Sequence, residues 1–364
     1  MHEVLRGLAL REPTDMPVLS IYLDMRQQAT GESPGRRVSL TILRDRLRAI
    51  ESTLGPRGED LESFRADDLR IRAFLDDHFD RSSQGLAVFA CSGTDLWETI
   101  ESGTPFADEV QAGPVPQLFQ LARLIDEQPP AIVAVVDSNT ARLFVSELGR
   151  LEELGGPDED PSNFQKRSMG GWSQSNYQRH IAKHHEDFAQ EAADAIVELF
   201  DRSHAQGIVL AGDEVALTPL LAALPERLKV LLGEVLRIDI RAPRDAIASE
   251  VVPVLARMAA EAARSIADRA MASVRSDGLG VAGPEPTHAT LRNAQVGTLL
   301  LSTTEGLAVT DTNELIRLAA ATDADIAIVG EHAELDRVGG VGGILRYRFE
   351  PTNRANDVAV GGEA

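Results

Sequence analysis

Several features common in proteins are scarce or absent in these 364 residues. The single cysteine, Cys91, has no partner for an internal disulfide, and a zinc site built from several cysteines is excluded. The longest uninterrupted apolar runs, such as Ala131 to Val136, have six residues, whereas a membrane-spanning helix needs about 18. The first residues lack the basic-then-apolar layout of a secretory signal. We therefore expect a cytoplasmic protein with no membrane partner.

Positive charge is also scarce. The chain has 36 Lys and Arg residues against 57 Asp and Glu residues, which gives a formal net charge of −21. This excess disfavours non-specific binding of nucleic acid over the whole surface, and we expect no DNA partner. Hydrophobic residues make up 43% of the chain, so a mainly disordered protein is excluded. At roughly 150 residues per domain, the length predicts two or three domains.

The first predicted domain spans residues 1–128. Strands are expected at residues 18–25, 86–91 and 96–100, where β-branched and aromatic residues gather. Apolar residues at helical spacing predict helices at 38–54 and 66–78. The pattern indicates a small mixed α/β domain.

Pro129 and Pro130 mark the first predicted boundary, and the second domain is expected to span residues 129–280. Its elements begin with a hairpin that turns at Asp137 to Asn139, because these residue types favour turns. A long helix ending near Phe200 is predicted from an apolar stripe, and a helix at 245–274 from similar spacing. Strands are expected at 207–212 and 235–240.

The third predicted domain spans residues 281–364. Its boundary with the second domain lies within a linker at 276–286, where glycine and proline concentrate. Strands at 297–302 and 326–330 alternate with a short helix after the linker and a helix near 313–321, and a glycine turn leads into a last strand after Gly339. This alternation predicts a small α/β sandwich. The expected fold is thus three mixed α/β domains.

Residues 162–185 differ from the rest of the chain because they contain no Asp or Glu. The segment reads SNFQKRSMGGWSQSNYQRHIAKHH. Its basic residues are Lys166, Arg167, Arg179 and Lys183. A polyanion approaching this acidic protein would find its favourable contacts here, since Lys and Arg neutralise phosphates. The alternative is a solvated loop and helix whose charges balance the preceding acidic loop.

Two adjacent glycines, Gly170 and Gly171, lie in the middle of this segment. Glycine permits positive φ and close approach of the backbone to a ligand, so the segment could bring backbone N–H groups and the Gln174 amide into a narrow cavity. Trp172 lies in a polar context and could stack on a base or fold back onto its own domain. A plain turn is the simpler interpretation of two glycines.

Several segments of the chain resemble those of a known family, which comprises the archaeal and eukaryotic class-1 peptide-chain release factors, Pelota and their bacterial relatives. The segment AIVAVVDSNTARLFV is similar to the hairpin that opens the family's central domain, and GGWSQSNYQRHIAKHHEDFAQEAADAIVELF to its glycine-rich tip and following helix. GIVLAG is similar to the next strand. NAQVGTLLLS, IAIVG and GGVGGILRYRF are similar to the family's last domain. The resemblance covers residues 131–349.

This resemblance implies a protein of the ribosomal A site whose central domain reaches the peptidyl-transferase centre. In release factors a Gly-Gly-Gln tip helps a water molecule attack the peptidyl-tRNA ester. Here Trp172 occupies the third position, and Gln174 follows two residues later, as in Vms-type peptidyl-tRNA hydrolases. The resemblance therefore implies a catalytic role for Gln174, with Gly170, Gly171 and Ser173 shaping the tip. The residues implied in RNA contact are Lys166, Arg167, Trp172, Arg179, His180, Lys183 and His184.

The first domain lacks the family's motifs for stop-codon reading, and its nearest basic loop element is Arg36-Arg37. Ribosome rescue by hydrolysis of peptidyl-tRNA is the first hypothesis. The second is occupancy of the A site in hibernation or stress, as in the similar factor Balon. The third is an acidic interaction module unrelated to ribosomes. The expected partners are rRNA and P-site tRNA, and the resemblance to Pelota allows delivery by a translational GTPase.

No cofactor is expected. His180 and His184 lie four residues apart and would share a helix face, as metal ligands do, but packing or RNA contact explains them better. The sequence contains no HExxH pattern and no G-x-S-x-G around Ser173. We therefore predict no metal site and no serine-hydrolase chemistry.

Overall fold

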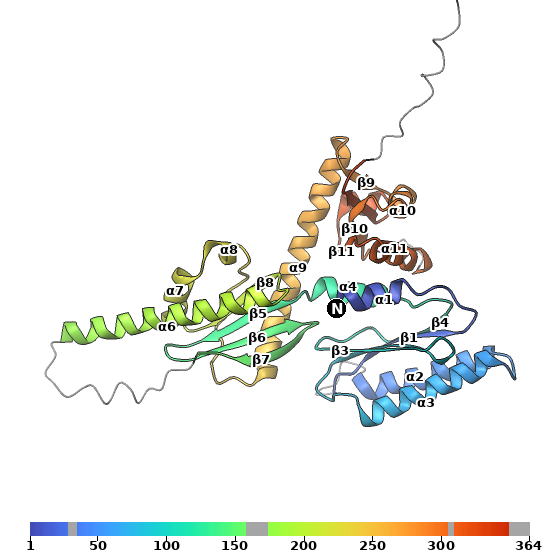
Figure 1. Ribbon diagram of the computed structural model, residues 1–364, viewed down its shortest axis with the longest axis horizontal. Coiled ribbons are helices and arrows are strands. Elements are labelled where there is room, and N and C mark those ends of the chain that lie inside the picture. Colours follow the sequence, from blue (N-terminus) through green and yellow to red (C-terminus); the bar gives the residue numbers. More distant parts are fainter. Residues whose placement is uncertain (28–34, 158–173, 305–308, 349–364) are drawn as a thin grey trace, which may run out of the picture. The chain divides into compact units, whose positions relative to one another are not determined.

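The computed structural model describes residues 1–27, 35–157, 174–304 and 309–348. These residues form three four-stranded sheets with helices packed on them, which confirms the predicted mixed α/β class (Figure 1). The chain divides into two compact units, Met1–Ala262 and Ala263–Ala364. The predicted domain boundaries near residues 128 and 280 stay predictions. Within the described ranges, none of the helices combines the length and hydropathy needed to cross a bilayer.

The first sheet is antiparallel throughout and has the order β3-β2-β1-β4. Its strands are β1 (Val18–Asp24), β2 (Gly85–Cys91), β3 (Leu96–Ser102) and β4 (Glu109–Gly113). The accompanying helices are α1 (His2–Ala9), α2 (Gly35–Thr53), α3 (Glu59–Asp77), the short 3-10 helix η1 (Ser92–Thr94) and α4 (Phe119–Glu127). The three predicted strands and both predicted helices are confirmed, although α3 begins seven residues earlier than expected. Strand β4 and helices α1 and α4 were not predicted.

Alternating residues of β1 face opposite sides of this sheet. Leu19, Ile21 and Leu23 join a core with residues of α2 and α3. Tyr22 faces the other side, where its ring centre lies 5.7 Å from that of Phe89 and the two rings are nearly perpendicular, at 87°. Because both faces are covered, β1 and β2 are buried along their whole length. Cys91 is a buried free thiol.

The second sheet has the order β7-β6-β5-β8. Its strands are β5 (Ala131–Val136), β6 (Ala141–Glu147), β7 (Arg150–Gly155) and β8 (Gly207–Gly212). Strand β5 pairs antiparallel with β6 and parallel with β8, so the predicted hairpin is confirmed and β7 extends it by an unpredicted third strand. The Asp137 carboxylate accepts hydrogen bonds from the Asn139 and Thr140 amides at 2.8 and 2.7 Å, which fixes the predicted turn.

Helices cover both faces of this second sheet. They are α6 (Gln174–Arg202), α7 (Glu214–Ala223), α8 (Glu226–Lys229) and the first part of α9 (Arg244–Arg275). Alternation along β5 directs Ile132, Ala134 and Val136 towards the α6 and α7 side. The intervening residues Ala131, Val133 and Val135 pack with Ile247 and Val251 of α9. The helices predicted to end near Phe200 and to span 245–274 are confirmed.

The strand predicted at residues 235–240 is wrong. This segment runs beside β8 but pairs with it only through isolated bridges, Leu232 with Ile208 and Leu236 with Ala211. The two bridges are three residues apart in β8 (211 − 208) and four apart in the neighbouring segment (236 − 232). The extra residue interrupts the hydrogen-bond ladder, as in a bulge. Residue composition does not reveal such a shift.

The unit Ala263–Ala364 contains the third sheet, of order β11-β10-β12-β9. Its strands are β9 (Gly280–Ala282), β10 (Val296–Ser302), β11 (Asp325–Val329) and β12 (Val341–Leu345), and its helices are α10 (Pro284–Arg292), α11 (Val309–Ala321) and α12 (Ala333–Arg337). Strand β10 is parallel to β11 and antiparallel to β12. The predicted alternation of strands and helices is confirmed. The glycine turn before the last strand is confirmed by Gly339 and Gly340, which have φ of +96° and +73°.

The linker predicted at residues 276–286 is wrong in part, because it contains β9 and the start of α10. Its glycine content has another physical reason. A Cβ atom on Gly280 would lie 2.5 Å from the Ala270 carbonyl oxygen and 2.5 Å from the Val274 amide nitrogen. Strand β9 can therefore pack against the end of α9 only with glycine at this position.

Candidate functional site: helix α6 and its base

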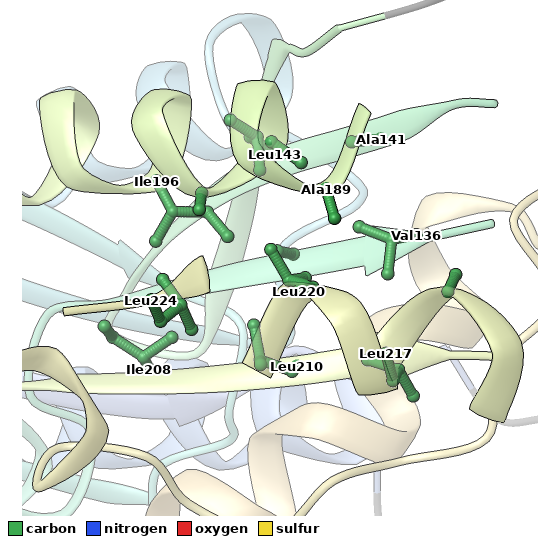
Figure 2. Packing of buried hydrophobic residues seen from close by; sticks show 14 of the residues in the cluster. Val136, Ala141, Leu143, Ala189, Ile196, Ile208, Leu210, Leu217, Leu220 and Leu224 are labelled. Carbon is green, nitrogen blue, oxygen red and sulfur yellow. The ribbon is translucent and has the colours of Figure 1, made fainter. Parts of the chain in front are cut away.

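Helix α6 is held on the second sheet by a buried stripe in its C-terminal half. Phe188, Ala192 and Ile196 are 3%, 1% and 0% exposed. They belong to a core with β5, β6, β8 and α7, and Figure 2 shows Ala189 and Ile196 of this helix close to Leu143 and Leu220. The i, i+4, i+8 spacing of the three residues confirms this part of the predicted stripe.

An ion pair holds the C-terminal end of α6. The Arg227 guanidinium of α8 donates two hydrogen bonds to the Asp201 carboxylate, both of 2.8 Å. This bidentate contact lowers the pKa of Asp201 below its ordinary value. Buried packing fixes the direction of the helix relative to its own sheet, and this exposed ion pair adds a weak contact at its end.

The N-terminal half of α6 extends beyond this core. Fourteen residues precede Phe188, the first buried side chain among those described in α6. At 1.5 Å per residue, Gln174 lies about 21 Å from Phe188 along the helix. Figure 1 shows this part of α6 extending past the edge of the second sheet. We call residues 174–187 the α6 arm.

The arm begins at Gln174, which is the first residue of the helix. The first four backbone N–H groups of any α-helix lack intrahelical acceptors, and the helix dipole adds partial positive charge at this end. The first turn of α6 carries no acidic residue that would neutralise that charge. The beginning of the arm thus offers backbone donors and positive potential to an anionic or developing anionic group.

A small cavity lies at the base of the arm. It is lined by the β5–β6 turn and by α6 and α7, namely by Val136, Asp137, Ser138, His185, Phe188, Ala189, Ala192, Ala216 and Leu220. His185 is half-buried there. The turn that Asp137 stabilises therefore sits against the helix where the buried stripe begins.

The predicted site residues fall into two groups. Gly170, Gly171, Trp172, Ser173, Lys166 and Arg167 lie outside the described residues. Gln174, Arg179, His180, Lys183 and His184 all lie on the arm. Among these five side chains, that of Lys183 is described, and it is exposed. The predicted roles of both groups stay predictions.

A single arginine, Arg142, connects two strands of the second sheet with the segment before α9. Arg142 of β6 donates to both oxygens of Glu153 on β7, at 2.7 and 2.9 Å, and its remaining nitrogen donates to the carbonyls of Ile240 and Ala242. This pairing lowers the pKa of Glu153. Sequence reasoning missed this contact, because its partners are separated by up to 100 residues and no local pattern connects them.

The structure differs from the sequence-based interpretation at two further places. Arg36 and Arg37, described there as a basic loop element, lie in helix α2. Helix α7 was missed, although Asp213 caps it by accepting from the Ala216 amide at 2.9 Å. An acidic residue before the spaced leucines Leu217 and Leu220 is a signal that could have identified it.

In the described part of the chain, no three His, Cys, Asp or Glu side chains gather in a way that could hold a metal ion. His180 and His184, the pair considered above, have undescribed side chains.

Comparison with known proteins shows what this chain resembles. No curated protein sequence matches the chain. Similar solved structures include the archaeal translation termination factor aRF1 (19% identity, 95% of this chain and 96% of that one, TM-score 0.27). Others are Pelota from Archaeoglobus fulgidus (14%, 73% and 80%, TM-score 0.36) and Dom34 from S. cerevisiae (10%, 75% and 84%, TM-score 0.37).

The match to a family model is specific to the middle of the chain. Residues 116–256 match bacterial archaeo-eukaryotic release factor family 10. This range contains the whole second sheet together with α6, α7 and α8. The resemblance to the bacterial branch of the release factor and Pelota class is thereby confirmed for the part of the chain that carries the candidate site.

Proposed function

We propose that this protein is a ribosome-binding translation factor that presents the end of the α6 arm to the peptidyl-transferase centre. The observation that supports this most is the arm itself. It starts at Gln174, directly after the GGWS segment, and extends about 21 Å beyond the first buried residue of the helix. The family match over residues 116–256 includes this helix and the sheet that holds it.

The proposed chemistry is hydrolysis of peptidyl-tRNA. A water molecule attacks the ester carbonyl, the tetrahedral oxyanion forms, and the tRNA 3′-hydroxyl leaves with a proton. Gln174 would orient the water, while Gly170, Gly171 and Ser173 would shape the segment before it. Backbone N–H groups at the beginning of α6 would stabilise the oxyanion, and such donors contribute about 10²- to 10³-fold in rate. Positioning of the water adds to this effect without an ionised side chain.

The basic and aromatic residues around this segment would bind the RNA that surrounds the centre. Lys and Arg residues neutralise phosphates, and Trp172 would stack on a base. The residues proposed for these contacts are Lys166, Arg167, Trp172, Arg179, His180, Lys183 and His184. The protein would act in the cytoplasm, with rRNA and P-site tRNA as partners and delivery by a translational GTPase as a further proposal.

Co-sedimentation with 70S ribosomes that hold P-site peptidyl-tRNA and an empty A site tests the binding proposal. The basic variant replaces four residues with glutamine, namely Lys166, Arg167, Arg179 and Lys183. The control variant replaces four exposed arginines elsewhere with glutamine, namely Arg46, Arg241, Arg292 and Arg337. We expect the basic variant to lose binding and the control to keep it. Equal binding of all three proteins, or no binding by the wild type, would contradict the proposal.

The absence of a strict Gly-Gly-Gln sequence favours a second function, in which the same arm occupies the A site of idle ribosomes without hydrolysis. Both functions require ribosome binding, but only the first releases the peptide. Ribosome binding that is not followed by peptide release would support occupancy, as in a hibernation or stress factor.

A further inference from the structure

Helix α2 concentrates positive charge on an otherwise acidic chain. Between residues 35 and 50 the sequence contains one acid, Asp45, and five arginines: Arg36, Arg37, Arg44, Arg46 and Arg48. The formal charge of this stretch is therefore +4, against −21 for the whole protein. Such a local excess calls for a physical explanation.

Three of these arginines line one open hollow on α2. Arg36, Arg37 and Arg44 surround it together with Leu40 and Thr41. Arg37, Thr41 and Arg44 follow the i, i+4, i+7 pattern of a single helix face. The rise between Arg37 and Arg44 is about 10.5 Å. We call Arg36, Arg37 and Arg44 the α2 arginine surface.

Two charges of this surface are not neutralised by any acid in the described part of the chain. Arg37 and Arg44 are exposed, and neither forms an ion pair with an acid among the described residues. Neighbouring arginines differ in this respect, since Arg65 pairs with Glu51 at 2.9 Å and Arg72 with Asp68 at 2.9 Å. The remaining member, Arg36, has its guanidinium 5.2 Å from the centre of the Phe79 ring.

Helix stability does not explain this arrangement. Acidic residues are favoured in the first turn of a helix, because they compensate the positive end of its dipole. The first turn of α2 has no acid and carries Arg36 and Arg37 instead. The core is formed by other residues of the helix, including Leu43 and Leu47.

We propose that the α2 arginine surface binds the phosphate backbone of RNA. Planar guanidinium groups donate paired hydrogen bonds that match phosphate oxygens, and two arginines on one helix face, separated by a rise of about 10.5 Å, can contact separate phosphates of one strand. The choice of RNA rests on the proposed function in translation. A membrane surface fits less well, because binding to lipid requires exposed apolar residues and Val38, 39% exposed, is the one large example on α2 among the described side chains.

The test uses the full chain and a fluorescein-labelled, mixed-sequence single-stranded RNA of about 20 nucleotides, a length that exceeds common single-strand site sizes. Anisotropy is measured at several KCl concentrations. The variant is Arg37→Gln with Arg44→Gln, and the control is Arg241→Gln with Arg292→Gln, which removes the same charge from exposed positions outside α2. Thermal melting confirms that both variants fold, since all four side chains are exposed.

We expect the Arg37/Arg44 variant to bind RNA at least about tenfold more weakly at low salt, with the control within about twofold of the wild type. The slope of log K against log salt should fall by about 1.4, at about 0.7 for each phosphate that is no longer neutralised. Equal weakening of both variants would show a net-charge effect and overturn the inference. Absence of RNA binding by the wild type would overturn it too, as would binding of the surface to phosphatidylserine vesicles in place of RNA.

Failure of this inference is distinguishable from failure of the proposed function. The Arg37/Arg44 substitutions are also introduced into the variant that lacks Lys166, Arg167, Arg179 and Lys183. If RNA binding there still depends on Arg37 and Arg44 while the wild type does not sediment with ribosomes, the proposed function fails and the inference stands. If the wild type sediments with ribosomes but RNA binding is independent of the two arginines, the inference alone fails.

Discussion

Arg142 and Glu153 form a bidentate ion pair between adjacent strands of the second sheet, with hydrogen bonds of 2.7 and 2.9 Å. The same arginine also donates to the backbone just before α9. One side chain therefore connects β6, β7 and the approach to α9, behind the helix that carries the candidate site.

This pair predicts a pH-dependent contribution to stability. The Arg142 hydrogen bonds lower the pKa of Glu153 in the folded protein, so the contribution is complete above the ordinary Glu pKa and is lost as pH falls through the lowered value. Because Glu153 is more than a third exposed, Glu153→Gln should cost only about 0.5–1 kcal/mol at pH 7. The difference in unfolding free energy from the wild type, measured by urea denaturation, should shrink towards pH 3. A constant difference across this range would contradict the assignment.

Gly212, at the end of β8, predicts a second and larger effect. Its φ is +143°, and a Cβ atom there would lie 1.9 Å from the Val136 carbonyl oxygen of β5. Gly212→Ala should therefore destabilise the protein by more than about 2 kcal/mol. Gly330→Ala is the control, since no atom lies within 4 Å of the added methyl group. Urea denaturation compares the two variants, and equal stability of both would show that the β5–β8 contact is looser than described.

The anchor of α6 predicts a link between packing and function. Ile196 is fully buried in the core beneath the helix. Ile196→Ala should cost about 2–5 kcal/mol, because it leaves a cavity. If the arm acts as proposed, this variant should also bind ribosomes more weakly as α6 loosens. Hydrogen exchange of α6 amides, measured beside co-sedimentation, checks the cause. Unchanged α6 protection would contradict the anchoring role.

Local sequence patterns predicted those helices, strands and turns whose formation depends only on residues within one segment. The stripe from Phe188 to Ile196 and the Asp137 turn are examples, since helix periodicity and turn chemistry depend on neighbours in sequence. Features that depend on distant partners were not predictable. The register shift at Leu236, the packing of Gly280 against α9 and the Arg142 contacts all arise from segments brought together by folding.

In the candidate site and on α2, too, local features were predictable from the sequence, whereas contacts between distant residues were not. The absence of acids around Gly170 and Gly171 and the resemblance of GGWSQ directed attention to helix α6, whose first residue is Gln174, and the functional roles of these residues stay predictions. That Arg37 and Arg44 pair with no acid in the described part of the chain could not be read from their positions in sequence. It depends on which acids pair with which arginines, and Glu51 and Asp68 pair with Arg65 and Arg72 instead.

Release of a labelled peptide tests the central claim most directly. Purified protein is mixed with 70S ribosomes that carry peptidyl-tRNA in the P site and have an empty A site, and release is followed under single-turnover conditions with wild type beside Gln174→Ala. We predict that the wild type accelerates release and that Gln174→Ala slows it by at least about tenfold, with co-sedimentation retained. Release at the same rate by both proteins, or no acceleration by a wild type that binds, would contradict the claim that the arm delivers a hydrolytic glutamine.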